Sequence, residues 1–180
     1  MKQACGVKPT LQQVSFAGMF LSRGFWLYVW EIFTMNSQRF YYVGRTGDKS
    51  SGASQSPFDR FSKHLGSNKN NNALRRQLEK RRIDPERCTF RFHAFGPLFR
   101  NSTANHGQLC DLASGLEKAL AEDMRSSGYE LLNEVHCRKP IDQRWRQKML
   151  AHFMSSFPKL AAVKRDATHS PNSSSHPPPP

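Results

Sequence analysis

Two short segments rich in aromatic and β-branched residues, separated by only a few residues, constrain the fold of this chain most strongly. Residues 26–34 and 40–44 both have the composition of a β-strand. Residues 35–38 between them read as a polar turn. Because a connection this short joins neighbouring antiparallel strands, the sequence predicts a β-hairpin.

The segment after the hairpin carries clear signals for the start and the end of a helix. Ser56 is the expected N-cap, Pro57 the first helical residue, and Asp59 the acid that completes a capping box. Gly66 is expected to end this helix. A second, strongly basic helix is predicted over residues 73–82.

The remaining pattern completes an α/β fold. Alternating apolar and polar residues predict a third strand over 88–94, which Gly96-Pro97 is expected to end. Leucines at helical spacing predict a third helix over 107–127, and a basic amphipathic helix is predicted over 141–153. The order is strand, strand, helix, helix, strand, helix. It predicts a small sandwich with a three-stranded, mainly antiparallel sheet flanked by helices.

The chain is expected to divide into four parts. They are a poorly ordered leader (1–25), a folded domain (26–137), a basic amphipathic helical extension (138–162) and a Ser- and Pro-rich tail (163–180). The tail cannot bury an apolar face, so it is predicted to be disordered.

The charge of the chain favours a polyanionic partner. Lys and Arg number 27 against 14 Asp and Glu, a formal net charge of +13 at pH 7. Such a surplus indicates nucleic acid first and an anionic membrane surface second, with a basic structural or ribosome-associated protein as the alternative. Arg23 and Glu31 interrupt the apolar stretch 14–35 and would be costly in hydrocarbon, so no membrane span is expected.

The cysteines indicate a reducing compartment. Cys5, Cys88, Cys110 and Cys137 are scattered and form no Cys-x-x-Cys pair. Isolated thiols in a chain of this length are typical of cytosolic proteins. We therefore expect a soluble, cytoplasmic protein, and no feature of the sequence indicates a protein partner.

Five polar residues are distributed over the predicted elements. Tyr42 lies on the second strand, Arg60 and His64 share one face of the first helix, Glu117 borders the leucine stripe of the third helix, and Asn133 follows that helix. Taken separately, each has an ordinary explanation: packing, a solvated helix face, a surface acid or a turn residue.

In this order and setting, these residues resemble the GIY-YIG nuclease family. The family's second signature matches Tyr42-Val43-Gly44, followed by Arg45, and the first aligns with Val29-Trp30 at the expected hairpin distance. The resemblance covers roughly residues 26–137. It implies a GIY-YIG endonuclease-like fold and a metal-dependent endonuclease that hydrolyses DNA phosphodiester bonds through attack by water.

The resemblance also implies roles for the acidic and cationic residues. Glu117 would hold a single Mg²⁺ or Mn²⁺, ions that prefer oxygen ligands. Arg60 would steady the scissile phosphate through its guanidinium fork, with His64 within reach of the same site.

Two tyrosine positions and an asparagine complete the implied site. Tyr42 would activate or position the attacking water, with the metal and Arg45 favouring its phenolate. Asn133 would support the site or the backbone around it. Trp30 stands where the family has a tyrosine, and Tyr28 stands at the family's glycine. Because an indole donates one hydrogen bond and accepts none, the alternative is a weak or inactive DNA-binding module of the same fold.

Basic residues provide candidate contacts to the DNA backbone. The second predicted helix carries Arg75, Arg76, Lys80, Arg81 and Arg82. Beside a phosphate-cutting site, such residues are expected to position the duplex without reading its sequence. A second basic cluster comprises Arg138, Lys139, Arg144, Arg146 and Lys148. It is either a clamp on flanking DNA or the polar face of a packed helix.

Overall fold

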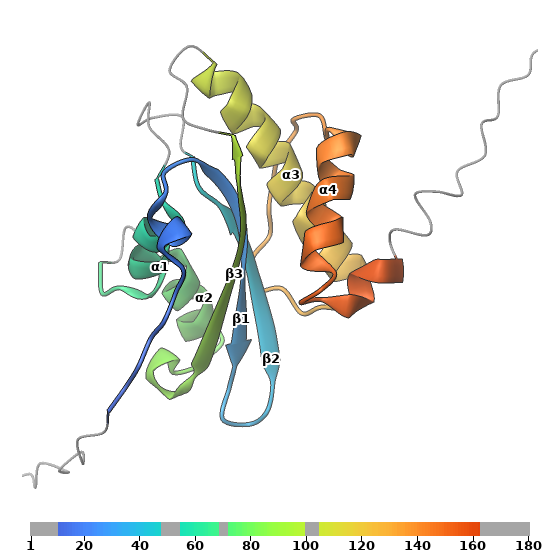
Figure 1. Ribbon diagram of the computed structural model, residues 1–180. Helices are drawn as coiled ribbons and strands as arrows, with labels where there is room; N and C mark the ends of the chain where they lie inside the picture. The colour runs from blue at the N-terminus through green and yellow to red at the C-terminus, as the bar shows by residue number, and fades with distance from the viewer. Residues whose placement is uncertain (1–10, 48–54, 69–71, 100–104, 163–180) are drawn as a thin grey trace, which may run out of the picture.

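A three-stranded antiparallel sheet divides the molecule into two layers of helices (Figure 1). The computed structural model describes residues 11–47, 55–68, 72–99 and 105–162. The strands are β1 (Phe25–Phe33), β2 (Arg39–Arg45) and β3 (Thr89–Phe99). Their order is β2-β1-β3, and β1 pairs antiparallel with both neighbours. The predicted α/β class and the three-stranded antiparallel sheet are confirmed.

Different helices cover the two faces of the sheet. The α-helices of the described residues are α1 (Pro57–Leu65), α2 (Ala73–Lys80), α3 (His106–Ser126) and α4 (Gln143–Phe153). Short 3₁₀ helices are η1 (Gly18–Leu21), η3 (Pro85–Arg87) and η4 (Pro158–Leu160). Helices α1 and α2 lie on one face of the sheet, and α3 and α4 lie on the other (Figure 1).

The central strand β1 supplies side chains to both layers, because successive residues of a strand point to opposite faces. Leu27 and Val29 pack in the core formed with α3 and α4. Tyr28, Trp30 and Ile32 pack in the smaller core formed with α1 and α2. Residues of both faces are buried, so β1 reads as a nearly continuous apolar run in the sequence.

Helix α1 begins and ends as the sequence predicts. The Ser56 hydroxyl accepts a hydrogen bond from the Asp59 backbone N–H at 3.1 Å, and the Asp59 carboxylate accepts one from the Ser56 N–H at 3.0 Å. These two bonds form a complete capping box with Pro57 in the first turn. The helix ends at Leu65, with Gly66 as its C-cap.

The predicted end of the third strand is wrong. β3 continues through Gly96 and Pro97 to Phe99. Because β3 is an edge strand that pairs only with β1, a proline there removes no hydrogen bond from a central ladder. The pairing register shifts between Phe25 and Leu27, opposite Gly96 and Pro97, and this irregularity accommodates them.

The boundaries of the folded part also differ from the prediction. Phe25 starts β1 and is fully buried, and Phe20 in η1 packs edge-on against Phe92 of β3 at 5.5 Å between ring centroids. Part of the expected leader therefore belongs to the fold. Residues 1–10 and the tail 163–180 lie outside the described residues.

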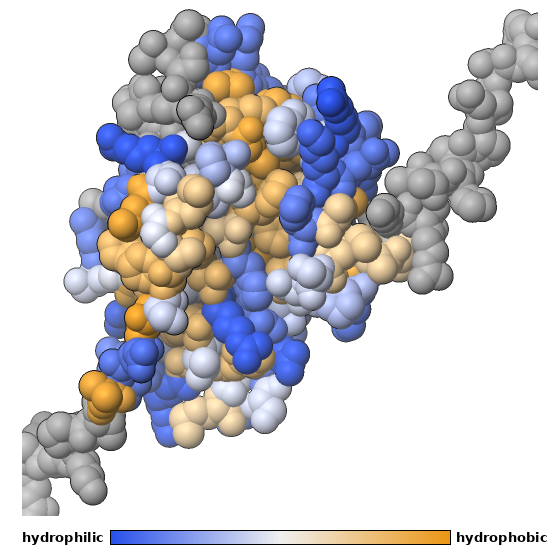
Figure 2. All heavy atoms as spheres, viewed as in Figure 1, coloured by the Kyte–Doolittle hydropathy of each residue, from blue (hydrophilic) through white to orange (hydrophobic). Residues whose placement is uncertain are grey.

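Helix α4 belongs to the main core. Its apolar side, Met149, Leu150 and Phe153, is buried there, while hydrophilic side chains gather on its outer surface (Figure 2). Amphipathic character is thus confirmed for this helix. Within the described residues, no helix is long and apolar enough to cross a membrane.

Candidate active site

A polar pocket of about 360 Å³ gathers residues that lie far apart in the sequence. Five of the seven predicted catalytic residues line it: Tyr42, Arg45, Arg60, His64 and Glu117. They come from β2, α1 and α3, and β1 and α2 contribute further residues to the wall. Trp30 and Asn133 are not part of the lining.

Glu117 is the only acidic residue among the described lining residues. Its Oε2 atom lies 3.1 Å from Nε of Arg45, and about a fifth of each side chain is exposed (19% and 21%). Burial raises the pKa of Glu117 to about 7, although the Arg45 and Arg60 guanidinium groups act in the opposite direction. Among the described lining residues, a single carboxylate therefore faces the pocket, and arginine balances its charge.

Several buried polar atoms around the pocket lack a hydrogen-bond partner among the described residues. They include Nε of Arg60, Oε1 of Gln55 and Nδ1 of His64. Buried polar groups are nearly always hydrogen-bonded, because leaving one unpaired costs free energy. Groups of this kind in an open pocket indicate that a polar ligand completes them, and an anion suits Arg60.

His64 forms a short hydrogen bond with Tyr28. The Tyr28 hydroxyl oxygen lies 2.6 Å from Nε2 of His64. Burial, with Arg60 nearby, lowers the pKa of His64 to about 4, and burial raises the pKa of Tyr28 well above its usual value. At neutral pH both side chains are uncharged, so the tautomer of His64 decides which of them donates this hydrogen bond.

Tyr28, rather than Trp30, presents its side chain to the pocket. Trp30 is fully buried beneath the pocket, where its ring stacks on Phe61 at 5.0 Å and meets Phe92 edge-on at 4.6 Å. The expectation that Trp30 contributes to the site is corrected by this placement. The side chains of Tyr28 and Trp30 both face the layer formed by α1 and α2. On the neighbouring strand β2, Tyr28 lies opposite Gly44, whereas Trp30 lies opposite Tyr42.

Gly44 is required by the Tyr28 ring. A Cβ atom at position 44 would lie 2.4 Å from three atoms of the Tyr28 side chain, including its hydroxyl oxygen. The absence of a side chain therefore lets the phenol cross β2 and reach His64. The sequence alone does not identify Tyr28, because its pairing with Gly44 depends on the register of the hairpin.

We predict that Gly44→Ala destabilises the fold. Forcing a methyl group against the Tyr28 ring is an overpacking change, which costs about 1–3 kcal/mol, and it would displace the phenol from His64. Urea unfolding followed by circular dichroism measures the effect. Gly107→Ala is a matched control, because a Cβ there meets nothing within 4 Å. Equal stability of the two variants would contradict the packing described.

Tyr42 is held as a neutral phenol. Burial and the Glu117 carboxylate raise its pKa to about 12, although Arg60 and Arg76 act to lower it. The predicted assistance from Arg45 toward a phenolate is not seen, because that guanidinium is paired with Glu117. Tyr42 is therefore suited to donate a hydrogen bond in the pocket.

Asn133 lies behind the pocket and holds the strand that carries Tyr42. Its Nδ2 donates to the Val43 carbonyl oxygen at 2.8 Å, and its Oδ1 accepts from the Val43 N–H at 3.1 Å. The side-chain amide thus pairs with β2 as another strand would. Asn133 was expected to support either the site itself or the backbone around it, and the structure shows that it binds the backbone.

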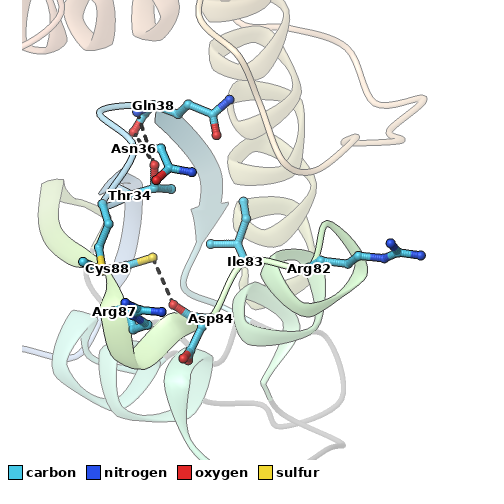
Figure 3. A pocket seen from close by; sticks show the side chains of 9 residues that line it. Thr34, Asn36, Gln38, Arg82, Ile83, Asp84, Arg87 and Cys88 are labelled. Carbon is cyan, nitrogen blue, oxygen red and sulfur yellow. Dashed lines mark hydrogen bonds between the residues drawn. The ribbon is translucent and has the colours of Figure 1, made fainter.

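The five basic residues predicted to bind DNA separate into two groups. Arg75 is held by Glu79 and Glu86, and Arg81 donates to the Leu132 carbonyl oxygen at 3.2 Å. Arg82 lies beside a different, smaller pocket near the β1–β2 turn, and its side chain points away from that pocket (Figure 3). Arg76, Lys80 and Arg82 are exposed and have no side-chain partner among the described residues, and of these three only Arg76 and Lys80 lie on α2.

Part of the second basic cluster has structural partners. Arg146 contacts the buried Asp123 carboxylate, with Nε at 3.0 Å from Oδ2, and Lys139 pairs with Asp111 at 2.8 Å. Lys148 lies over the Trp145 ring. These contacts favour the packed-helix explanation for the three residues.

The fold and the pocket define a small α/β protein with a cation-rich polar site at one side of its sheet. Comparison with known proteins yields no matching family model and no similar curated protein or solved structure. The geometry of this chain is therefore the basis for a functional proposal.

Proposed function

We propose that this protein is a metal-dependent DNA endonuclease that hydrolyses phosphodiester bonds by attack of water, with a site like that of the GIY-YIG nucleases. The observation that carries the proposal is the gathering of Tyr28, Tyr42, Arg60, His64 and Glu117 from four separate elements in one pocket. Phosphodiester hydrolysis needs a route for the proton of the water and positive charge around the phosphate. This set of side chains can supply both.

Glu117 is the residue that would hold the metal ion. No group of three or more His, Cys, Asp or Glu side chains suited to a metal occurs in the described residues. A single carboxylate suits Mg²⁺ or Mn²⁺, because Mg²⁺ in such sites keeps several waters and shares the substrate phosphate. The bound ion would supply positive charge that stabilises the oxygens of the reacting phosphate.

Arg60 would bind the scissile phosphate. Its guanidinium fork can donate two parallel hydrogen bonds to phosphate oxygens, and its Nε is buried without a partner among the described residues. The Tyr42 hydroxyl, kept protonated by a pKa of about 12, would donate to the water or to the phosphate.

The Tyr28–His64 pair would accept the proton of the attacking water. In the tautomer with its proton on Nδ1, His64 accepts at Nε2 from the Tyr28 hydroxyl. As water attacks phosphorus, its proton would move to the Tyr28 oxygen while the Tyr28 proton moves to Nε2. The products of this step are a neutral Tyr28 and a charged His64, which returns its proton to solvent or to the leaving oxygen.

We predict that cleavage depends on pH through Glu117. Because the pKa of this carboxyl group is about 7, the rate at low metal concentration should fall about tenfold per pH unit below that value. His64, with a pKa of about 4, stays neutral across this range. A pH–rate profile at subsaturating Mg²⁺ measures the effect, and a flat profile down to mildly acidic pH would contradict it.

The same pKa affects stability in the opposite direction. Between 4.5 and about 7 the folded chain keeps a proton on Glu117 that the unfolded chain has lost. The contribution of Glu117 to the free energy of unfolding therefore decreases as pH rises through this window. Metal binding would favour the carboxylate and reverse this cost.

The Arg45–Glu117 ion pair favours a second candidate, a DNA-binding module of the same fold that does not cut. In that case the arginine would permanently occupy the only carboxylate of the described lining. Incubating the protein with supercoiled plasmid and Mg²⁺ or Mn²⁺, with EDTA as the control, separates the two candidates. Metal-dependent cleavage supports the nuclease, whereas salt-sensitive binding without cleavage supports the module.

A further inference from the structure

The face of α2 that borders the pocket carries two cations without structural partners. Ala73 at the start of α2 lines the pocket. Arg76 and Lys80 follow three and seven residues later, so all three lie on one side of the helix. Neither the Arg76 side chain nor the Lys80 side chain forms a hydrogen bond or an ion pair with any described residue.

The other side of α2 is engaged in packing and ion pairs. Leu74 and Leu78 are buried against the sheet. Arg75 pairs with Glu79 at 3.0 Å and lies 3.8 Å from Glu86. On this short helix, Arg75 is therefore engaged with acidic side chains, whereas Arg76 and Lys80 are available to a ligand.

Of the two cations, Arg76 lies nearer the pocket, three residues along α2 from Ala73. Arg76 is close enough to Tyr42 to act on its pKa in the lowering direction, against the effects of burial and Glu117. From Arg76 to Lys80 the helix rises about 6 Å. The two side chains therefore extend a line of positive charge outward from the pocket.

We propose that the DNA strand leaves the pocket along α2, with Arg76 and Lys80 binding the backbone phosphates next to the scissile one. This inference rests on the proposed function, and it names the path of the substrate rather than the chemistry. Contacts of this kind carry no base sequence, so they would position DNA of any sequence over the pocket. Arg75, Arg81 and Arg82 are not part of this path.

The test compares charge-matched variants of α2 in a binding assay without cleavage. Wild type, Arg76→Gln and Lys80→Gln are titrated against a fluorescent duplex of about 20 base pairs in EDTA over a series of salt concentrations. Arg75→Gln and Arg82→Gln are the controls, because each removes one positive charge outside the proposed path. Arg75 is paired with Glu79 and Glu86, and Arg82 lies beyond the end of α2 beside the pocket near the β1–β2 turn. Circular dichroism verifies that every variant is folded.

We expect Arg76→Gln and Lys80→Gln each to weaken binding roughly threefold and to reduce the salt slope by about 0.9, as for one lost phosphate contact. The two controls should leave the slope close to that of wild type. Equal losses in all four variants, or losses confined to the controls, would overturn the proposed path. Because this binding assay contains no metal, its result does not depend on cleavage. A protein that binds DNA through Arg76 and Lys80 but does not cut plasmid with Mg²⁺ or Mn²⁺ would refute the nuclease proposal and leave the proposed path in place.

Discussion

Glu117→Gln is expected to reduce the rate of DNA cleavage by about a thousandfold, because a bound metal ion contributes several kcal/mol to stabilising the transition state. Glutamine has nearly the same shape but no negative charge, so it would fill the same space beside Arg45 and fail to hold the ion. Single-turnover cleavage of plasmid DNA in Mg²⁺ measures the loss.

Glu122→Gln is the matched control for this substitution. Glu122 lies on the same helix, is half exposed, and pairs with Lys118 at 3.4 Å. Its replacement should leave the rate unchanged, since exposed ion pairs contribute little. A Glu117→Gln protein that cleaves as fast as the Glu122→Gln protein would exclude Glu117 from the mechanism.

The second large effect is expected for Tyr28→Phe. Removing the hydroxyl leaves His64 without its partner and interrupts the proton route, and general acid–base catalysis is commonly worth a hundredfold or more. We therefore expect the cleavage rate to fall by about a hundredfold, with the fold retained. The same single-turnover assay measures this rate.

Trp30→Phe distinguishes Tyr28 from Trp30, the residue that the resemblance to the GIY-YIG family placed in the site. Trp30 is buried and outside the pocket lining, so its truncation should cost stability by about 1–3 kcal/mol through the cavity it leaves. The cleavage rate at a temperature where the variant is folded should stay close to that of wild type. A larger rate loss for Trp30→Phe than for Tyr28→Phe would contradict the assignment of Tyr28.

The sequence alone predicted the elements whose signals are local. The capping box at Ser56 and Asp59 specifies the start of α1 because both hydrogen bonds are formed within one turn. Leu116, Leu120 and Met124 specify the buried face of α3 through their spacing. These local signals were enough to place Arg60, His64 and Glu117 on elements that meet at one pocket.

Features that depend on pairing between strands could not be predicted in the same way. Tyr28 and Trp30 differ by two residues and face the same layer, so periodicity cannot decide which of them reaches the pocket. The register that sets Tyr28 opposite Gly44 decides it. Likewise, Gly96 and Pro97 were expected to end β3 because its position at the edge of the sheet is not visible in the sequence.

The basic residues of α2 show a similar limit. Their charge is evident in the sequence, but the carboxylates that engage Arg75 are only partly local: Glu79 is one turn away, and Glu86 lies beyond the helix. The backbone carbonyl of Leu132 that binds Arg81 comes from a distant segment. Tertiary structure therefore separates the cations available to a ligand from those already engaged.

The central claim is that water, activated in this pocket, cleaves the phosphodiester bond. The most direct test is single-turnover cleavage of plasmid by the wild-type protein with Mg²⁺ in water enriched in heavy oxygen. We expect cleavage that EDTA abolishes, one heavy oxygen in the new terminal phosphate, and no covalent protein–DNA adduct. Cleavage that persists in EDTA, a tyrosine-linked adduct, or a folded protein that binds DNA without cutting it under Mg²⁺ or Mn²⁺ would contradict the claim.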